Sequence, residues 1–104
     1  MSENKVIQRG QQCYVEIQGA LTAAVVPTLQ SDIRKMLELK MNEVSFDLKN
    51  CTMLDSSGIG LMMATFNTLA AKSGKISVVN VNKDIAKLLA SMRLTARLGV
   101  QQDA

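Results

Sequence analysis

The sequence predicts one small α/β domain with a mixed sheet and helices packed against it. Two observations carry this prediction. Apolar residues alternate with a period of two in several short segments, and between those segments they recur at helical spacing. A chain of 104 residues can bury about 65% of its unfolded surface, which is enough for a core. The predicted order is β-β-α-β-α-β-α-β, with a core from about residue 6 to residue 100 and a short polar tail at 101–104.

Two short strands and a helix are expected in the N-terminal part. Residues 6–9 and 14–18 have the composition of strands joined by a turn, and Gly19 is expected to end the second strand. Pro27 suits the first turn of a helix, because the N–H that proline lacks would have no partner there. The helix is expected to end near Lys40. Its apolar stripe consists of Val26, Leu29, Ile33, Met36 and Leu37.

The middle of the chain is expected to hold the central strand and helix. Residues 44–48 alternate between apolar and polar side chains, which is typical of a strand with one buried face, and a short loop is expected after them. A helix should then run from about Ser57 to Lys72. Gly74 is expected to follow the helix in the left-handed conformation.

The C-terminal part predicts a strand, a helix and a final strand. Residues 75–81 form a continuous run rich in β-branched residues, which is typical of a strand buried on both faces. Asn82 is a suitable N-cap for the helix that follows. That helix is expected to turn Ile85, Leu88, Leu89 and Met92 inward. Residues 94–100 should form a last, short strand.

The composition argues against several classes of function. The net charge is +3, but the lysines and arginines are scattered rather than clustered, so we expect no nucleic-acid binding. The sequence has no histidine, and Cys13 and Cys51 lie far apart, so we expect two buried reduced thiols, no metal and no cofactor. The start of the chain lacks the apolar region of a signal peptide. The longest uncharged run, residues 56–71, is shorter than the roughly 20 apolar residues of a membrane span. We therefore expect a cytoplasmic protein without a membrane span.

The chemically distinctive segment is Leu54-Asp55-Ser56-Ser57-Gly58-Ile59-Gly60, where the central strand leads into the central helix. One interpretation is structural: Ser56 or Ser57 caps the helix, and Asp55 interacts favourably with the helix dipole. The other interpretation is functional, because polar and small residues at the end of a strand in an open α/β sheet occupy the position where sites form.

Catalysis by these serines is disfavoured. A nucleophilic serine needs a base beside its hydroxyl, and no histidine is present to serve as one. Weak nucleotide binding at the helix N-terminus remains a further interpretation, although the lysine of a P-loop is absent. We therefore expect that the protein is not an enzyme.

Residues 54–60, following Val-x-Phe-Asp-Leu at 44–48, resemble the signature of the STAS domain of bacterial anti-sigma factor antagonists. Gly19-Ala20-Leu21-Thr22, with Pro27 and Leu29 after it, is similar to a second segment of that family, although Ala20 and Thr22 stand where acidic residues are common. The order of elements also agrees. The resemblance implies the STAS fold, with residues 1–104 as a single STAS domain.

The resemblance further implies a partner-switching regulator. The unphosphorylated protein would bind and sequester an anti-sigma factor that is also a serine kinase of the histidine-kinase-like ATPase type. Phosphorylation of Ser57, with Ser56 as second choice, would release that partner, and a PP2C-type phosphatase would reverse the modification. The residues expected to contact the partner are Asp55, Ser56, Ser57, Gly58, Ile59, Gly60 and Met62. Alternatively, the chain is a STAS binding module that regulates a non-sigma output or serves as a subunit of a transport or sensory complex.

Overall fold

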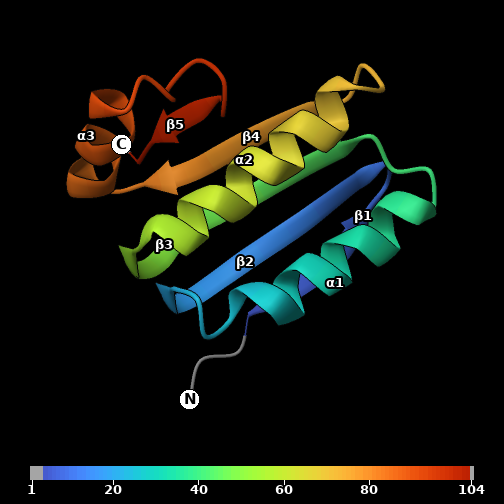
Figure 1. The fold of residues 1–104 in the computed structure, drawn as a ribbon, viewed down its shortest axis with the longest axis horizontal. Helices are drawn as coiled ribbons and strands as arrows, with labels where there is room; N and C mark the ends of the chain where they lie inside the picture. The colour runs from blue at the N-terminus through green and yellow to red at the C-terminus, as the bar shows by residue number, and fades with distance from the viewer. Residues whose placement is uncertain (1–3, 104) are drawn as a thin grey trace.

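The computed structural model describes residues 4–103, which form a five-stranded mixed sheet and three helices (Figure 1). In chain order the elements are β1 (Lys5–Arg9), β2 (Gln12–Leu21), α1 (Val26–Glu38), β3 (Glu43–Leu54), α2 (Ser56–Ala70), β4 (Lys75–Val81), α3 (Lys83–Ser91) and β5 (Val100–Gln102). The predicted α/β class and order of elements are confirmed. Residues 1–3 and Ala104, at the start of the chain and the end of the predicted tail, lie outside the described residues.

The strands lie in the same order in the sheet as in the chain. β1 pairs with β2 in antiparallel orientation, and every later neighbour is parallel. Helix α1 connects β2 to β3, and α2 connects β3 to β4. Because each parallel strand is added on the same side of the last, right-handed crossovers carry these two helices to one face of the sheet, where Figure 1 shows them side by side.

The opposite face of the sheet remains partly open to solvent. Tyr14 of β2, Asp47 of β3 and Val79 of β4 are all half-buried on this face. The prediction that residues 75–81 are buried on both faces is therefore wrong. The reason is that β4 has the continuous apolar composition that is typical of strands covered by helices on both faces, although helices cover only one face here.

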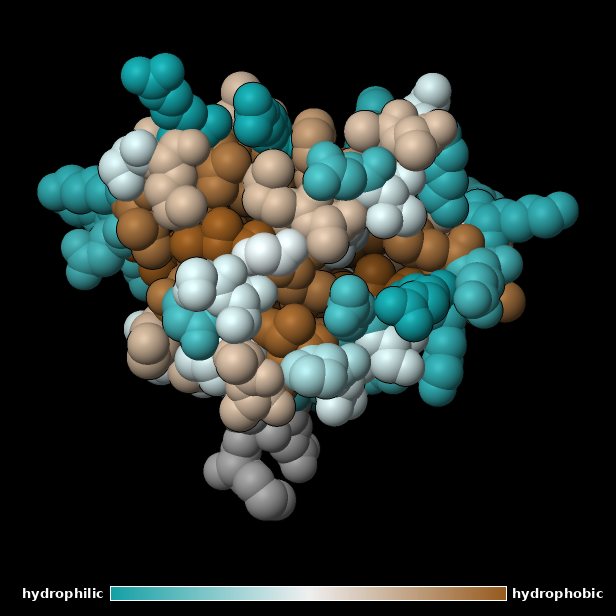
Figure 2. Space-filling view, viewed as in Figure 1, coloured by the Kyte–Doolittle hydropathy of each residue, from teal (hydrophilic) through white to brown (hydrophobic). Residues whose placement is uncertain are grey.

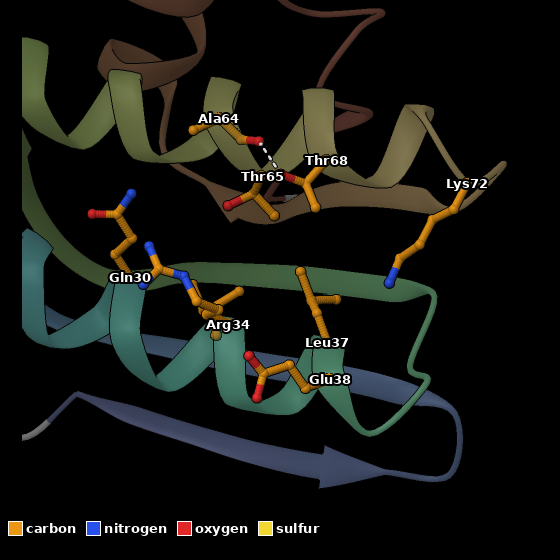
Figure 3. Close-up of a pocket in the computed structure, with 9 residues that line it drawn as sticks. Gln30, Arg34, Leu37, Glu38, Ala64, Thr65, Thr68 and Lys72 are labelled. Atoms are coloured by element: carbon orange, nitrogen blue, oxygen red, sulfur yellow. Dashed lines mark hydrogen bonds between the residues drawn. The ribbon is translucent and has the colours of Figure 1, made fainter.

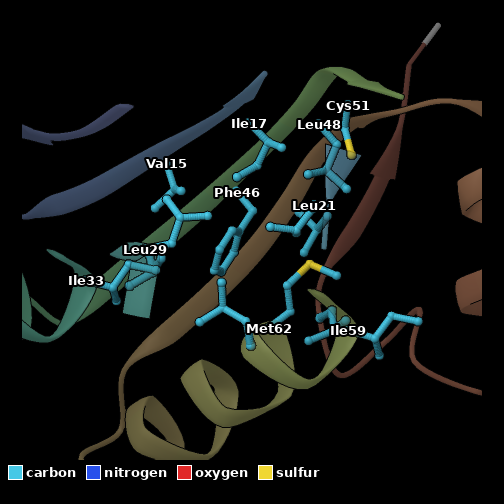
Figure 4. Close-up of a cluster of buried hydrophobic side chains, with 14 of the residues drawn as sticks. Val15, Ile17, Leu21, Leu29, Ile33, Phe46, Leu48, Cys51, Ile59 and Met62 are labelled. Carbon is cyan, nitrogen blue, oxygen red and sulfur yellow. The ribbon is translucent and has the colours of Figure 1, made fainter. Parts of the chain in front are cut away.

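The core lies between the sheet and helices α1 and α2. Figure 4 shows Phe46 of β3 within this cluster, and the side chain is 0% exposed. Cys13 and Cys51 are buried free thiols, as predicted. Burial raises the pKa of the Cys13 thiol to about 11, since the charged thiolate is poorly solvated there.

Both strands that lead to the distinctive segment are longer than predicted. β2 continues through Gly19 to Leu21, and Gly19 takes a positive φ of 83° at an irregularity in the pairing with β3. β3 continues to Leu54 through the expected loop, because residues 50–54 pair with residues 18–21. Such irregularities bend two paired strands without ending their pairing. The alternation of apolar and polar residues within one strand does not reveal them.

The end of α2 differs from its prediction. Ser73, rather than Gly74, adopts the left-handed conformation, with φ of 58°. Gly74 donates its amide hydrogen to the carbonyl oxygen of Leu69 at 2.7 Å. A Cβ on Gly74 would lie 2.5 Å from the carbonyl oxygen of Asn42, so the glycine permits a close approach of two backbones.

The C-terminal helix is capped as predicted but buries fewer residues. The Asn82 side chain accepts a hydrogen bond from the Ile85 amide at 2.8 Å. Ile85 and Leu89 are buried, whereas Leu88 is 38% exposed and Met92 is 47% exposed, so the inward orientation expected for the latter two is wrong. The buried residues of α3 are Ile85 and Leu89, one turn apart, so this helix packs along a narrow stripe.

The final strand lies later than predicted. β5 occupies residues 100–102, and residues 95–99 form turns instead of the expected strand over 94–100. Leu94 and Leu98 are nonetheless buried, at 6% and 0% exposure. These two buried side chains attach the turns to the core. The sequence alone does not distinguish such turns from a short strand.

Candidate functional site

The distinctive segment lies where the carboxyl ends of β2 and β3 meet the start of α2. The Asp55 side chain caps this helix, because Oδ1 accepts a hydrogen bond from the Gly58 amide at 3.0 Å. Its Oδ2 accepts a second hydrogen bond, from the Ala23 amide at 3.2 Å. Asp55 also donates its own amide hydrogen to the Leu21 carbonyl at 3.3 Å. One aspartate therefore holds the start of α2 against the loop between β2 and α1.

The two serines occupy the first turn of α2 without serving as its cap. Helix α2 begins at Ser56, which is exposed, and Ser57 follows it half-buried. The interpretation in which a serine caps the helix is wrong, because the Asp55 carboxylate fills that role. Both hydroxyls therefore stand at the positive end of the helix dipole without a capping function.

The two glycines of the segment have different surroundings. Gly58 is buried, and a Cβ placed on it would lie 2.6 Å from the carbonyl oxygen of Leu21. Gly60 is exposed, and a Cβ placed there meets nothing within 4 Å. Gly58 thus permits the close packing of α2 on β2, while Gly60 leaves a bare patch of helix at the surface.

Ile59 and Met62, two apolar residues that were expected to contact a partner, are buried in the core beneath the start of α2. Met62 is 0% exposed and lies among core side chains in Figure 4, so its expected contact with a partner is corrected. Ile59 is 9% exposed and also belongs to the core. Helical spacing places both side chains toward the sheet, which outweighs their proximity to the serines in the sequence.

Met53 is a surface residue that sequence reasoning missed. Its side chain is 51% exposed, directly before the segment. Cys51 pairs with Gly19 and Met53 pairs with Ala20, which leaves Thr52 between them without a partner in β2. This extra residue changes the alternation, and no sequence signal indicates it. We call the surface formed by Met53, Asp55, Ser56, Ser57 and Gly60 the serine surface.

The serine surface carries a stable negative charge. The hydrogen bond from the Gly58 amide is the main reason that the pKa of Asp55 lies below its usual range, and the Ala23 amide contributes further. The carboxylate is thus ionised at neutral pH beside both serines. Among residues 4–103, no cluster of three or more His, Cys, Asp and Glu side chains is arranged to hold a metal.

A second polar cluster lies on the open face of the sheet. The Asp47 carboxylate accepts hydrogen bonds from the Tyr14 hydroxyl, from the Asn80 side-chain amide at 3.0 Å and from the Lys49 backbone amide at 2.9 Å. The Arg9 guanidinium lies 3.9 Å from the centre of the Tyr14 ring. These contacts connect β1, β2, β3 and β4 across the open face of the sheet, whereas the serine surface lies at the carboxyl ends of β2 and β3.

The Tyr14 and Asp47 side chains shift each other's pKa in opposite directions. The hydrogen bond to Asp47 is the main cause that raises the pKa of Tyr14, because it stabilises the protonated phenol. Burial acts to raise the pKa of Asp47, but the hydrogen bonds from Tyr14, Asn80 and Lys49 together lower it below its usual range.

None of the helices in the described part of the chain has the length and apolar character needed to cross a membrane. The family model for the STAS domain matches residues 4–103. A search of curated proteins found no match.

Several solved structures are similar to the chain. An anti-sigma factor antagonist from Mycobacterium paratuberculosis is 18% identical with a TM-score of 0.82, over 97% of this chain and 86% of that one. The phosphorylated Bacillus cell fate determinant SpoIIAA is 18% identical with a TM-score of 0.76, over 100% and 91%. A sulfate transporter family protein from Wolinella succinogenes is 12% identical with a TM-score of 0.76, over 93% and 81%. At these identities the similarity concerns the fold.

Proposed function

Because the chain belongs to the STAS domain family, we propose that it is an anti-sigma factor antagonist in a partner-switching pathway. The observation that carries the proposal is the N-cap of α2. Asp55 caps the helix, so the hydroxyls of Ser56 and Ser57 are left at an accessible edge with no capping function. Two anti-sigma factor antagonists with the same fold, the Mycobacterium paratuberculosis protein and SpoIIAA, add support.

In this proposal the unphosphorylated serine surface binds an anti-sigma factor that is a serine kinase of the histidine-kinase-like ATPase type. Met53 supplies an exposed apolar side chain, at 51% exposure, and Gly60 lets the partner approach the helix backbone. Binding sequesters the anti-sigma factor and frees the sigma factor. The chain acts as a substrate and binding protein in the cytoplasm, with catalysis supplied by the kinase and by a PP2C-type phosphatase.

Phosphorylation of Ser57 would end the interaction electrostatically. The kinase forms a bond between Ser57 Oγ and the γ-phosphorus of ATP, ADP leaves, and the hydroxyl proton is released. The phosphoryl group adds about −1.5 to −2 charge beside the ionised Asp55. A hundredfold loss of affinity requires about 2.7 kcal/mol. Burial of an uncompensated dianion against a partner can exceed that amount.

The phosphate would be accommodated without a change of fold. The helix N-terminus offers a partial positive charge to an anion on its first turn, and Ser57 is the second residue of α2. The loss of binding is therefore local to the serine surface. A large change in the circular dichroism spectrum on phosphorylation would contradict this account.

The test is the mass of the intact protein isolated from its native host under several growth conditions, with and without serine phosphatase. We expect a fraction that carries one phosphatase-sensitive phosphoryl group, which fragment mapping assigns to Ser57. Ser57→Ala should abolish the modification, and Ser56→Ala serves as the matched control that retains it. Only unmodified protein under every condition would reject the proposal.

The second candidate is a STAS binding module that serves a transport or sensory complex. The shared fold of a sulfate transporter family protein favours it. Such a module would bind its partner equally well as wild type and as Ser57→Asp, whereas the antagonist would lose its partner in Ser57→Asp and keep it in Ser57→Ala. Nucleotide binding, the weaker alternative, requires saturable ATP or GTP binding that is reduced in Ser57→Ala.

A further inference from the structure

Helices α1 and α2 leave a groove between them, on the helical side of the molecule and away from the serine surface. The groove has a volume of about 300 Å³ and is lined by Gln30, Ile33, Arg34, Leu37 and Glu38 of α1 and by Ala64, Thr65, Thr68 and Lys72 of α2. Figure 3 shows these side chains facing one another across the space between the two helices. The volume lies at the lower end of the range for small-molecule sites.

The interior of the groove is apolar. Ile33 is 3% exposed and Thr65 is 5% exposed, so both lie at its floor, and the half-buried Leu37 forms part of one wall. Thr65 donates its hydroxyl hydrogen to the Leu61 carbonyl at 2.9 Å, and Thr68 donates its own to the Ala64 carbonyl at 3.0 Å. Because both donors are used within α2, the groove offers no hydroxyl hydrogen to a ligand. Figure 2 shows apolar surface exposed in the hollow between the helices.

The rim of the groove is basic. Arg34 on α1 and Lys72 on α2 are both exposed, and Figure 3 shows the Lys72 ammonium reaching from α2 toward α1. The Arg34 guanidinium lies beside the Gln30 side chain, so several N–H donors gather at one end of the groove. Glu38 lies along α1, and the only hydrogen bond among the residues drawn in Figure 3 joins Thr68 to Ala64. Arg34 and Lys72 bring two positive charges to the rim and Glu38 brings one negative charge, so the net charge of the rim is positive.

We propose that this groove is a binding site for a free alkyl carboxylate of medium chain length. The alkyl chain lies along Ile33, Leu37 and Ala64, and the carboxylate accepts hydrogen bonds from Arg34 and Gln30 at one end of the groove. Lys72 lies toward the other end and adds to the positive charge of the rim. An apolar floor together with a cationic rim matches an anionic amphiphile and disfavours a cationic one. The site does not depend on the serine surface or on the proposed function.

The test is titration of the ¹⁵N-labelled protein with decanoate, followed by backbone amide NMR signals. We expect saturable shifts confined to the parts of α1 and α2 that line the groove. Arg34→Gln should weaken binding about threefold to fivefold, the effect of losing one exposed charge interaction. Arg97→Gln is the matched control, because Arg97 is also exposed but lies outside the groove. Ser57→Ala should bind decanoate as wild type does.

A second pair of variants tests the space itself. Ala64→Leu should block the groove and abolish the shifts while the rest of the spectrum remains that of the folded protein, since Ala64 is exposed and leucine favours helix. Ala90→Leu adds the same bulk at an exposed position of α3 and should leave binding unchanged. Equal affinity for decanol and decanoate, shifts without saturation spread over the surface, or wild-type affinity in Arg34→Gln would each overturn the proposal.

Discussion

At the scale of single residues, Asp55 determines how the serine surface is built. Its two carboxylate oxygens accept hydrogen bonds from Gly58 and Ala23, so one side chain both caps α2 and fixes the neighbouring loop. This frees two serine hydroxyls for other chemistry. The same carboxylate places a negative charge where a phosphoryl group on Ser57 would add to it.

The lowered pKa of Asp55 also predicts that the stability of the protein depends on pH. Its pKa is lowered in the folded state, so the stabilisation is present above the unfolded pKa of about 3.9 and is lost as the pH falls through and below that value. Asp55→Asn keeps an oxygen that can cap the helix but removes the charge. We expect the variant to unfold at a lower urea concentration than the wild type near neutral pH and to approach the wild type as the pH falls, so that its own loss of stability under acid conditions is weaker. An unchanged acid dependence would contradict this assignment.

Tyr14 provides a direct measurement of the cluster on the open face. It is the only tyrosine and the chain has no tryptophan, so the ultraviolet absorbance of tyrosinate reports its pKa alone. Asp47→Asn should lower that pKa toward the ordinary value of about 10, because the variant removes the charged acceptor and its repulsion of the phenolate. Asp84→Asn, on α3, is the matched control with no expected change.

The raised pKa of Tyr14 also has a consequence for stability. The folded protein holds this proton more tightly than the unfolded chain, so the contribution is fully present below about pH 10 and decreases as the pH rises above that value. Asp47→Asn should reduce the decrease. Urea unfolding at neutral and alkaline pH measures it.

At the scale of secondary-structure elements, α2 depends on two glycines with opposite roles. The Gly58 backbone packs against Leu21 of β2, whereas Gly60 faces solvent. The sequence does not show which of the two glycines is buried. The packing of α2 on β2 gives them different roles. The start of the helix is therefore fixed by tertiary contact at one glycine and left accessible at the other.

Alanine at each glycine tests this difference. Gly58→Ala should destabilise the protein by about 1–3 kcal/mol, because the added methyl group overlaps the Leu21 carbonyl. Gly60→Ala should stabilise it by roughly 0.5–1 kcal/mol, since alanine favours helix and meets no neighbouring atom. Urea unfolding of the two variants gives both values. If Gly58→Ala were as stable as Gly60→Ala, the described packing of α2 on β2 would be wrong.

At the scale of the whole molecule, the sheet has one covered and one open face. The strands follow one another across the sheet, so α1 and α2 share a face, and the groove forms where they do not meet. The core under these helices is largely aliphatic, with Phe46 as its largest fully buried side chain. Stability should therefore be concentrated on one side of the sheet.

Truncation on each face measures this asymmetry. Phe46→Ala should cost about 3–5 kcal/mol, because it removes a fully buried aromatic ring and leaves a cavity. Val79→Ala, at a half-buried position of the open face, should cost about 1 kcal/mol or less. The two free energies of unfolding come from urea denaturation. Similar costs for both variants would mean that the open face is covered in solution.

The sequence by itself determined the element types, their order and the location of the distinctive segment. Alternation in residues 44–48, helical spacing after Ser57, Pro27 in the first turn of α1 and the Asn82 cap are local signals, because they depend on residues within one or two turns. These signals also located the serines at the start of a helix. Such patterns carry no information about contacts between distant segments.

Only the tertiary structure decided how the segment is used. Asp55 rather than a serine caps α2, Met53 is exposed because Thr52 is unpaired, and Met62 lies in the core. The length of β2 and β3, the open face of β4 and the groove between α1 and α2 were also decided there. Each of these depends on the register between strands or on the packing of one element against another, and residues far apart in the chain set both.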